Sequence, residues 1–170
     1  MKNTPNAKNK SKTQTIQRFV FVEVPIEYVG PQVALWGEAA WWPKNCLWKY
    51  IKETEGEVKV GTRYRIKIQK PSAADWVAEV TQFVPNRLIE YTFKAGMFRG
   101  YQVIKLEERA NGTRVDFELH FRVSGLLNAF LWPFVYQKQY EETIMQVLNA
   151  LKDNLPQQYQ QEQDKHPEGQ

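Results

Sequence analysis

The stretch that decides the fold lies at residues 101–122 and reads YQVIKLEERANGTRVDFELHFR. Two alternating runs flank Asn111-Gly112, a dipeptide typical of a two-residue hairpin turn. A turn there pairs Ala110 with Thr113, and directly opposed residues share one face of the sheet. The predicted inward pairs are Leu106 with Phe117, Ile104 with Leu119, and Gln102 with Phe121. The predicted outward pairs, Lys105 with Glu118 and Tyr101 with Arg122, are polar, so the hairpin has one apolar face and one wet face.

A second hairpin is predicted before the first, with its turn at Pro85-Asn86. The same construction places three pairs on the inward face: Val80 with Tyr91, Ala78 with Phe93, and Gln82 with Ile89. Residues 62–69 also alternate, which predicts another half-buried strand. Its apolar face carries Tyr64, Ile66 and Ile68.

A long amphipathic helix is predicted over residues 126–155, bent near Pro133. Strands at 16–24 and 47–54 and short helices within 26–40 complete the pattern. A sheet with one apolar face must have that face covered, and only the long helix is large enough to cover it. The sequence therefore predicts an α+β helix-grip fold, a curved antiparallel sheet wrapped around a long C-terminal helix, with short helices after the first strand.

The charge is concentrated at the start of the chain. The sequence holds 23 basic and 19 acidic residues, and the first fifteen residues contain Lys2, Lys8, Lys10 and Lys12 but no acid. We therefore expect a disordered basic arm at 1–15, a ligand-binding domain at 16–155 and a disordered Gln-rich tail at 156–170. Without the arm, the chain holds equal numbers of basic and acidic residues, which argues against a nucleic-acid partner.

The single cysteine, Cys46, indicates a reducing compartment. The N-terminus has no apolar signal region, and no apolar run reaches the roughly 18 residues of a spanning helix. We expect a cytoplasmic protein. Transient contact with an anionic membrane surface is an added expectation from the lysine-rich arm.

General acid–base catalysis requires a titratable group in the interior. The predicted registers send Glu118 and His120 outward and leave Glu108 inward only at the rim of the sheet. Two histidines and one cysteine at these spacings form no metal site. We therefore predict no catalytic residue, no metal and no cofactor. The polar inward residues Tyr64, Tyr91, Gln82 and Gln102 either orient a ligand in an apolar pocket or meet backbone and water in a filled core.

Several motifs resemble those of the START-like (Bet v 1-like, SRPBCC) superfamily, and within it the polyketide cyclase/dehydrase and lipid-transport group. They are Val24-Pro25-Ile26-Glu27, Trp42-Pro43-Lys44, the span from Gly56 to Gly61-Thr62, and LNALKDNL at 148–155. The resemblance implies a cavity between the sheet and the C-terminal helix that binds apolar molecules, with Trp42 near its entrance. The chain departs from the family pattern at Gly30-Pro31, where the first helix usually runs unbroken.

The first hypothesis is binding or carriage of an apolar small molecule, such as a lipid, isoprenoid or polyketide. The predicted ligand-binding residues are Trp42, Tyr64, Ile66, Val80, Gln82, Tyr91, Phe93, Gln102, Ile104, Phe117, Leu119, Phe121, Phe134, Tyr140 and Ile144. One alternative is a cyclase or dehydratase that uses Glu108, Glu23 or Asp75 inside the cavity. Another is an interaction module, in which the apolar run 126–134 docks to a membrane or protein instead of packing inside.

Overall fold

The computed structural model describes residues 13–70 and 75–165. Seven antiparallel strands form one sheet in the order β1-β7-β6-β5-β4-β3-β2. The strands are β1 (Gln14–Val22), β2 (Trp48–Lys52), β3 (Arg63–Ile68), β4 (Asp75–Val84), β5 (Leu88–Gly96), β6 (Phe98–Arg109) and β7 (Gly112–Val123). The helical elements are α1 (Ile26–Ala34), α2 (Leu126–Leu131), the π-helical turn η1 (Trp132–Tyr136) and α3 (Gln137–Lys165).

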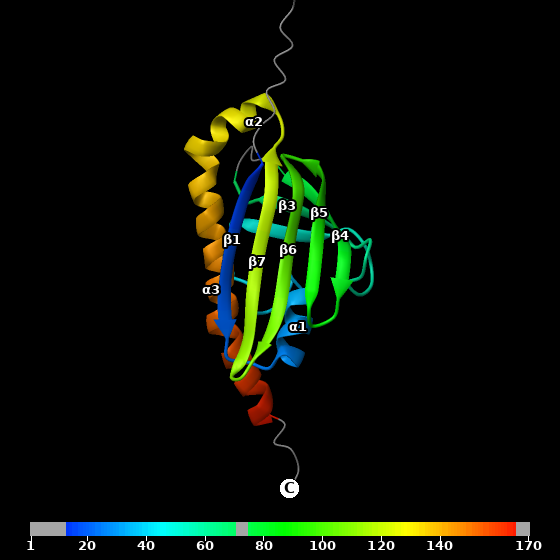
Figure 1. Ribbon diagram of the computed structural model, residues 1–170, viewed down its shortest axis with the longest axis vertical. Helices are drawn as coiled ribbons and strands as arrows, with labels where there is room; N and C mark the ends of the chain where they lie inside the picture. The colour runs from blue at the N-terminus through cyan, green and yellow to red at the C-terminus, as the bar shows by residue number, and fades with distance from the viewer. Residues whose placement is uncertain (1–12, 71–74, 166–170) are drawn as a thin grey trace, which may run out of the picture.

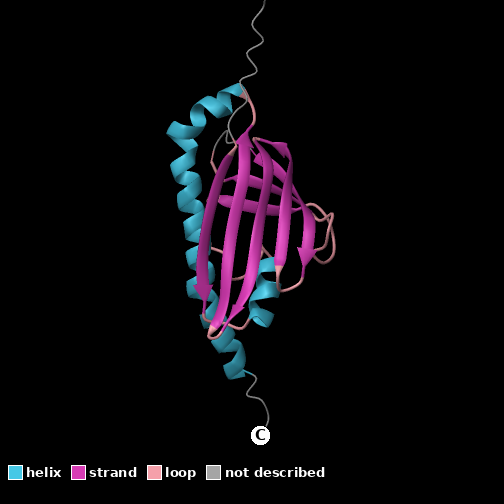
Figure 2. Ribbon diagram, in the orientation of Figure 1, coloured by secondary structure: helices cyan, strands magenta, loops and turns pink. Residues whose placement is uncertain are grey.

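The long helix α3 runs along the curved sheet, with α1 near one end of the strands and α2 at the other (Figures 1 and 2). Every second residue of β7 from Thr113 to Val123 is buried, so this strand presents one face to the helix. The buried face of α3 carries Tyr140, Thr143, Ile144, Val147, Leu148, Leu151 and Leu155. The predicted α+β helix-grip fold is confirmed.

The β6–β7 hairpin turns one residue earlier than predicted. Its turn residues are Ala110 and Asn111, and Arg109 pairs with Gly112, which has a φ of 152°. Ile104 consequently opposes Phe117, so the predicted partners are wrong by two residues. Because side chains alternate with a period of two, this displacement keeps both of these residues on the predicted face.

The β4–β5 hairpin contains a β-bulge that the sequence did not predict. Val80 opposes Tyr91 as predicted, but the register shifts between Val80 and Gln82, and Gln82 opposes Glu90. A bulge inserts one extra residue in a strand and turns later side chains to the other face. Gln82 is therefore exposed, while Phe83 opposes Ile89 and packs against the core. The prediction that Gln82 points inward is wrong.

The predicted bend near Pro133 is confirmed, because η1 separates α2 from α3. The predicted end of the folded domain at residue 155 is too early. Helix α3 continues through Pro156 to Lys165, and the Tyr159 ring packs edge-to-face on Tyr28 with 4.9 Å between centroids. Most of the predicted arm (residues 1–12) and the end of the predicted tail (166–170) lie outside the described residues. None of the described helices is long and apolar enough to span a membrane.

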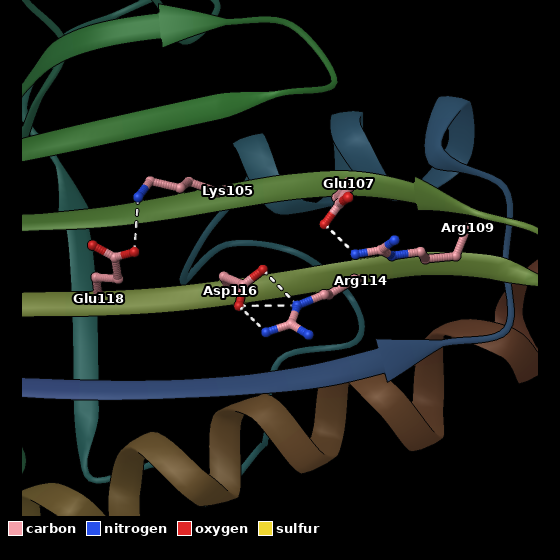
Figure 3. A network of polar contacts seen from close by, with 6 residues as sticks. All are labelled: Lys105, Glu107, Arg109, Arg114, Asp116 and Glu118. Atoms are coloured by element: carbon pink, nitrogen blue, oxygen red, sulfur yellow. Dashed lines mark hydrogen bonds and ion pairs between the residues drawn. The ribbon is translucent and has the colours of Figure 1, made fainter.

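The outer face of the sheet carries interleaved charges (Figure 3). Lys105 pairs with Glu118 at 2.7 Å, and Arg114 pairs with Asp116 at 2.8 Å. The same arrangement lowers the pKa of Glu118, chiefly through its hydrogen bond from Lys105. These pairs are partly exposed, so each stabilises the fold by no more than about 1 kcal/mol. Their main effect is to fix which face of the sheet remains in water.

We predict that Tyr159→Ala lowers the free energy of unfolding by about 1 kcal/mol, because it removes the aromatic contact with Tyr28. The exposed neighbour Gln161 provides the control, and Gln161→Ala should change stability by less than about 0.5 kcal/mol. Urea denaturation of the full chain measures both. Equal stability of the two variants would show that the end of α3 does not pack on α1.

Candidate functional site

The predicted ligand-binding residues mostly lie together inside the fold. Twelve of them are buried between the sheet and α3. They are Tyr64, Ile66, Val80, Tyr91, Phe93, Gln102, Ile104, Phe117, Leu119, Phe121, Tyr140 and Ile144. Trp42 is half-buried and packs on the core, with its ring 5.3 Å from Trp36 and 5.5 Å from Tyr50. The structure therefore brings these residues to one inward surface.

Gln82 and Phe134 do not belong to this surface. Gln82 is turned out by the bulge in β4, as described above. Phe134 is 81% exposed, whereas Trp132, two residues earlier in η1, is buried. The prediction for Phe134 is wrong because it assumed one helical stripe through Pro133, and the π-helical turn changes which residues face inward.

Aromatic rings fill much of the interior. Near α2, the Tyr140 ring lies between Trp48, at 4.5 Å, and Trp132, at 5.5 Å. Towards α1, a row of three tyrosine rings crosses the inward face, with centroids 6.2 Å apart for Tyr50 and Tyr64 and 6.0 Å apart for Tyr64 and Tyr91. Such edge-to-face contacts are favourable arrangements of aromatic pairs. The residues of this surface therefore pack against one another as well as facing α3.

Five polar side-chain atoms of the described residues are buried without a hydrogen-bond partner. They are the hydroxyls of Tyr28, Tyr64 and Tyr91 and the Nε1 atoms of Trp36 and Trp48. Two other indoles do have partners: Trp41 Nε1 donates to the Gln32 carbonyl at 3.2 Å, and Trp132 Nε1 donates to Gln14 Oε1 at 3.0 Å. A buried unpaired polar group costs about 1–3 kcal/mol. Two of the five atoms, the hydroxyls of Tyr64 and Tyr91, belong to predicted ligand-binding residues.

Burial also fixes the protonation state of these tyrosines. Desolvation raises the pKa of Tyr64 and, still more, that of Tyr91 above the ordinary value, and neighbouring Glu38 and Tyr64 add to the effect. Both phenols are therefore neutral hydroxyls at neutral pH, able to donate or accept a hydrogen bond.

The other buried polar residues among those described are Thr62, Gln102, Thr113 and Thr143. All three threonines are bonded to backbone, since Thr113 Oγ1 donates to the Val24 carbonyl, Thr143 Oγ1 donates to the Gln139 carbonyl, and Thr62 Oγ1 accepts from the Lys59 N–H. Gln102 lies on the inward face directly opposite Tyr91 in the β5–β6 register. It adds an amide beside the two unpaired phenols.

The carboxylates considered for acid–base chemistry lie on the outside. Glu23 and Glu108 are exposed, and Asp75 pairs with Arg65 at 3.2 Å on the outer face. His120 is also outward, stacked on Tyr101 at 4.7 Å and 3.6 Å from Glu118. Within residues 13–70 and 75–165, no group of three histidine, cysteine or acidic side chains is placed to hold a metal ion.

An apolar pocket of about 600 Å³ opens beside α1. Its walls are α1, the end of β2, the loop before β3, and the β4–β5 turn, and its lining residues are Gly30, Pro31, Ala34, Leu35, Lys52, Gly56, Glu57, Val58, Phe83, Pro85 and Asn86. The Lys52 ammonium is bonded to the Gly56 carbonyl, so it closes the loop. The sequence pattern did not predict this pocket. The interruption of the first helix expected at Gly30-Pro31 is absent, and both residues lie within the continuous helix α1, which forms one wall.

A narrow cleft of about 10 Å³ adjoins the pocket on its inner side. It shares Gly30, Ala34, Phe83 and Asn86 with the pocket and extends to Ile89 and Ile104. These two isoleucines face each other across β5 and β6, one inward step from the pair Tyr91 and Gln102. The cleft thus ends at the strand pair next to Tyr91 and Gln102, and neither of these residues lines it.

Gly30 sets how closely α1 approaches this turn. A Cβ at residue 30 would overlap the side-chain amide of Asn86, so only glycine fits at this contact. Asn86 itself has a φ of 58° in the tight turn between β4 and β5. The contact holds α1 over the inner end of the pocket.

A larger hollow of about 830 Å³ lies between β1 and the solvent side of α3. Its lining includes Arg18 and Glu141, which form an ion pair at 3.3 Å. Because these partly exposed charges line it, this hollow is less suited to an apolar molecule than the pocket beside α1.

Solved structures with the same fold cover most of the chain. A protein from Thermus thermophilus is 17% identical, with a TM-score of 0.65 over 84% of this chain and 97% of the other. The protein Ara h 8.0201 is 13% identical, with a TM-score of 0.63 over 86% and 99%. A Thalictrum norcoclaurine synthase point mutant with a transition-state analogue is 10% identical, with a TM-score of 0.61 over 88% and 98%. At these identities, the similarity shows the fold.

Comparison of the sequence with protein families identifies the family as well as the fold. None of the curated proteins matches the chain. The family model described as polyketide cyclase/dehydrase and lipid transport matches residues 13–155, which is nearly the whole described fold up to Leu155. The chain therefore belongs to the polyketide cyclase/dehydrase and lipid-transport family.

Proposed function

We propose that this protein binds and carries an apolar small molecule, such as a lipid, isoprenoid or polyketide, which enters beneath α1. The observations that carry the proposal are the buried, unpartnered hydroxyls of Tyr64 and Tyr91 on the inward face and the apolar pocket beside α1, whose adjoining cleft reaches Ile89 and Ile104. A pocket of about 600 Å³ is within the usual range for a small-molecule site. The family and fold are consistent with hydrophobic ligands.

The chemistry of the path selects the class of ligand. Its inner wall, at Ile89, Ile104 and Phe83, is apolar, so it favours an aliphatic or ring-containing body. The hydroxyls of Tyr64 and Tyr91 and the amide of Gln102 favour one polar end, such as a carbonyl or hydroxyl. We therefore propose an apolar ligand with a single hydrogen-bonding group, bound with that group inward.

Carriage is favoured over catalysis by the placement of the charged groups. Acid–base catalysis needs a titratable side chain within hydrogen-bond reach of the substrate. Glu23, Glu108 and Asp75, the candidates for such a role, lie outside the interior. The free, buried Cys46 accords with a reducing, cytoplasmic setting for the carrier.

Ala34→Trp tests the proposed entrance, because Ala34 lines both the pocket and the inner cleft. The indole should fill the path, and binding of the fluorescent probe 1-anilinonaphthalene-8-sulfonate should fall at least about tenfold. Val60→Trp is the control, since Val60 is 60% exposed in the same loop region and does not line the pocket. Ala34→Leu, a smaller obstruction, serves if the indole prevents folding. Unchanged probe affinity in a folded Ala34 variant would rule out this entrance.

Tyr64→Phe tests the polar end of the site. The unliganded protein should keep its free energy of unfolding or gain about 1 kcal/mol, because the deleted hydroxyl has no described partner. The preference for a long-chain methyl ketone over the alkane of equal length should fall about tenfold, because a hydrogen bond to the ligand is lost. Probe-displacement titrations with both ligands measure this preference.

Tyr101→Phe is the matched control for that experiment, because Tyr101 is 39% exposed on the outer face. It should leave the ketone preference unchanged. If Tyr64→Phe and Tyr91→Phe both keep the full preference for the ketone over the alkane, the two hydroxyls do not orient the ligand.

A further inference from the structure

Three large apolar side chains stand in water on one side of the α2–η1 segment. Leu127 is 70% exposed, Phe130 is 69% exposed and Phe134 is 81% exposed. Their spacing places them on one helical face, and the rings of Phe130 and Phe134 are 6.2 Å apart. We call these three residues the apolar ridge. Contiguous exposed apolar groups of this kind are typical of an interaction surface.

The other side of the same segment is fixed in the core. Trp132 is 1% exposed, and its ring lies 5.3 Å from Phe98 and 5.1 Å from Phe121. Its Nε1 donates a hydrogen bond to Gln14 at the start of β1. The buried Trp132 therefore fixes the orientation of the segment, with the apolar ridge facing outward.

Basic residues accumulate at the same end of the fold. Arg99 and Arg122 face each other across β6 and β7 next to α2, and both are exposed. The Arg99 guanidinium donates to the backbone carbonyls of Gly96 and Phe98, and neither arginine pairs with a carboxylate within the described part of the chain. Two like charges directly opposite each other are unfavourable unless an anion lies nearby.

The sequence that precedes β1 is basic. Residues 1–12 carry Lys2, Lys8, Lys10 and Lys12 and no acid, and they join the fold just before Gln14, the residue bonded to Trp132. Apolar side chains beside clustered Lys and Arg are the combination with which peripheral proteins bind anionic lipid surfaces. A second copy of the chain is a poorer occupant, because pairing two ridges would also bring two sets of these cations together.

We infer that the apolar ridge docks onto an anionic lipid bilayer, with Leu127, Phe130 and Phe134 entering the interface and Arg99 and Arg122 contacting the headgroups. This inference goes beyond small-molecule binding and stands independently of it. The ridge lies at the α2 end of the sheet, whereas the pocket mouth lies by α1 and the β4–β5 turn at the other end (Figure 1). Substitutions in the ridge consequently leave the proposed ligand site untouched.

The test is flotation of the full chain with vesicles of phosphatidylcholine alone or mixed with phosphatidylserine. The native chain should bind the mixed vesicles. Phe130→Ser/Phe134→Ser should weaken this binding at least about tenfold, because the two aromatic rings that enter the bilayer interface are lost. Phe19→Ser is the matched control, since Phe19 is a phenylalanine 60% exposed on β1. It should bind like the native chain.

Charge reversal tests the headgroup contact. Arg122→Glu should weaken binding to the mixed vesicles, and Arg109→Glu, at the far end of the same hairpin, should not. Circular dichroism and urea denaturation confirm that each variant is folded. Absence of native binding to mixed vesicles overturns the inference, as does full binding by the folded ridge variant. Concentration-dependent dimerisation that the ridge variant abolishes, without vesicle binding, would assign the ridge to a second copy instead.

Discussion

The burial of the sheet's inward face against α3 is the interaction on which the rest of this structure depends. Every second residue along β7 enters this interface, and Val147, Leu148 and Leu151 meet it from the helix. Apolar burial contributes about 25 cal/mol per Å², so it is the largest stabilising contribution. The same alternation places the ion pairs of β6 and β7 in water. The alternation of buried and exposed residues along the strands therefore determines which face packs on α3, which face carries the charges, and which side chains form the interior.

The interior combines dense aromatic packing with polar atoms that the packing does not satisfy. The rings of Trp48 and Tyr140 are 4.5 Å apart, yet the Trp48 Nε1 has no described hydrogen-bond partner. Phenylalanine at Tyr64 and Tyr91 would fill the same space without the desolvation of a hydroxyl. Stability alone does not account for these polar atoms, and the proposed binding of a molecule with one polar group would satisfy them. The site is thus separable in principle from the core that surrounds it, although the same strands build both.

Much of the fold was predictable because it depends on periodicity. The inward positions of Tyr64, Ile104 and Phe117 follow from alternation, which survives even the two-residue error in the β6–β7 register. Single insertions were not predictable, because a bulge carries no distinct sequence mark in β4, and Gln82 faces outward for that reason. Helix continuity was also misjudged. The polar composition after residue 155 predicted a disordered tail, but α3 continues to Lys165 and Tyr159 packs on Tyr28.

In the candidate site, too, the features that follow from periodicity were predictable and the others were not. Apart from Gln82 after the bulge in β4, the predicted residues on strands lie on the predicted inward face, whereas the pocket beside α1 is assembled from a helix, a loop and a turn that are distant in the sequence. No local pattern indicates that such segments converge. For the apolar run from Leu126 to Phe134, the sequence left open whether it packs inside or docks to a membrane or protein. Only the structure shows that its π-helical turn sends Trp132 inward and Phe134 outward.

The length of α3 has a geometric consequence. At about 1.5 Å per residue, its 29 residues extend roughly 40 Å, from the neighbourhood of α2 past the level of α1. A molecule held to a bilayer at its α2 end would stand with this helix as an upright post and its pocket mouth facing the aqueous phase. The pocket mouth would then lie well above the headgroups, beyond a Debye length of about 8 Å, where the surface charge of the membrane is screened.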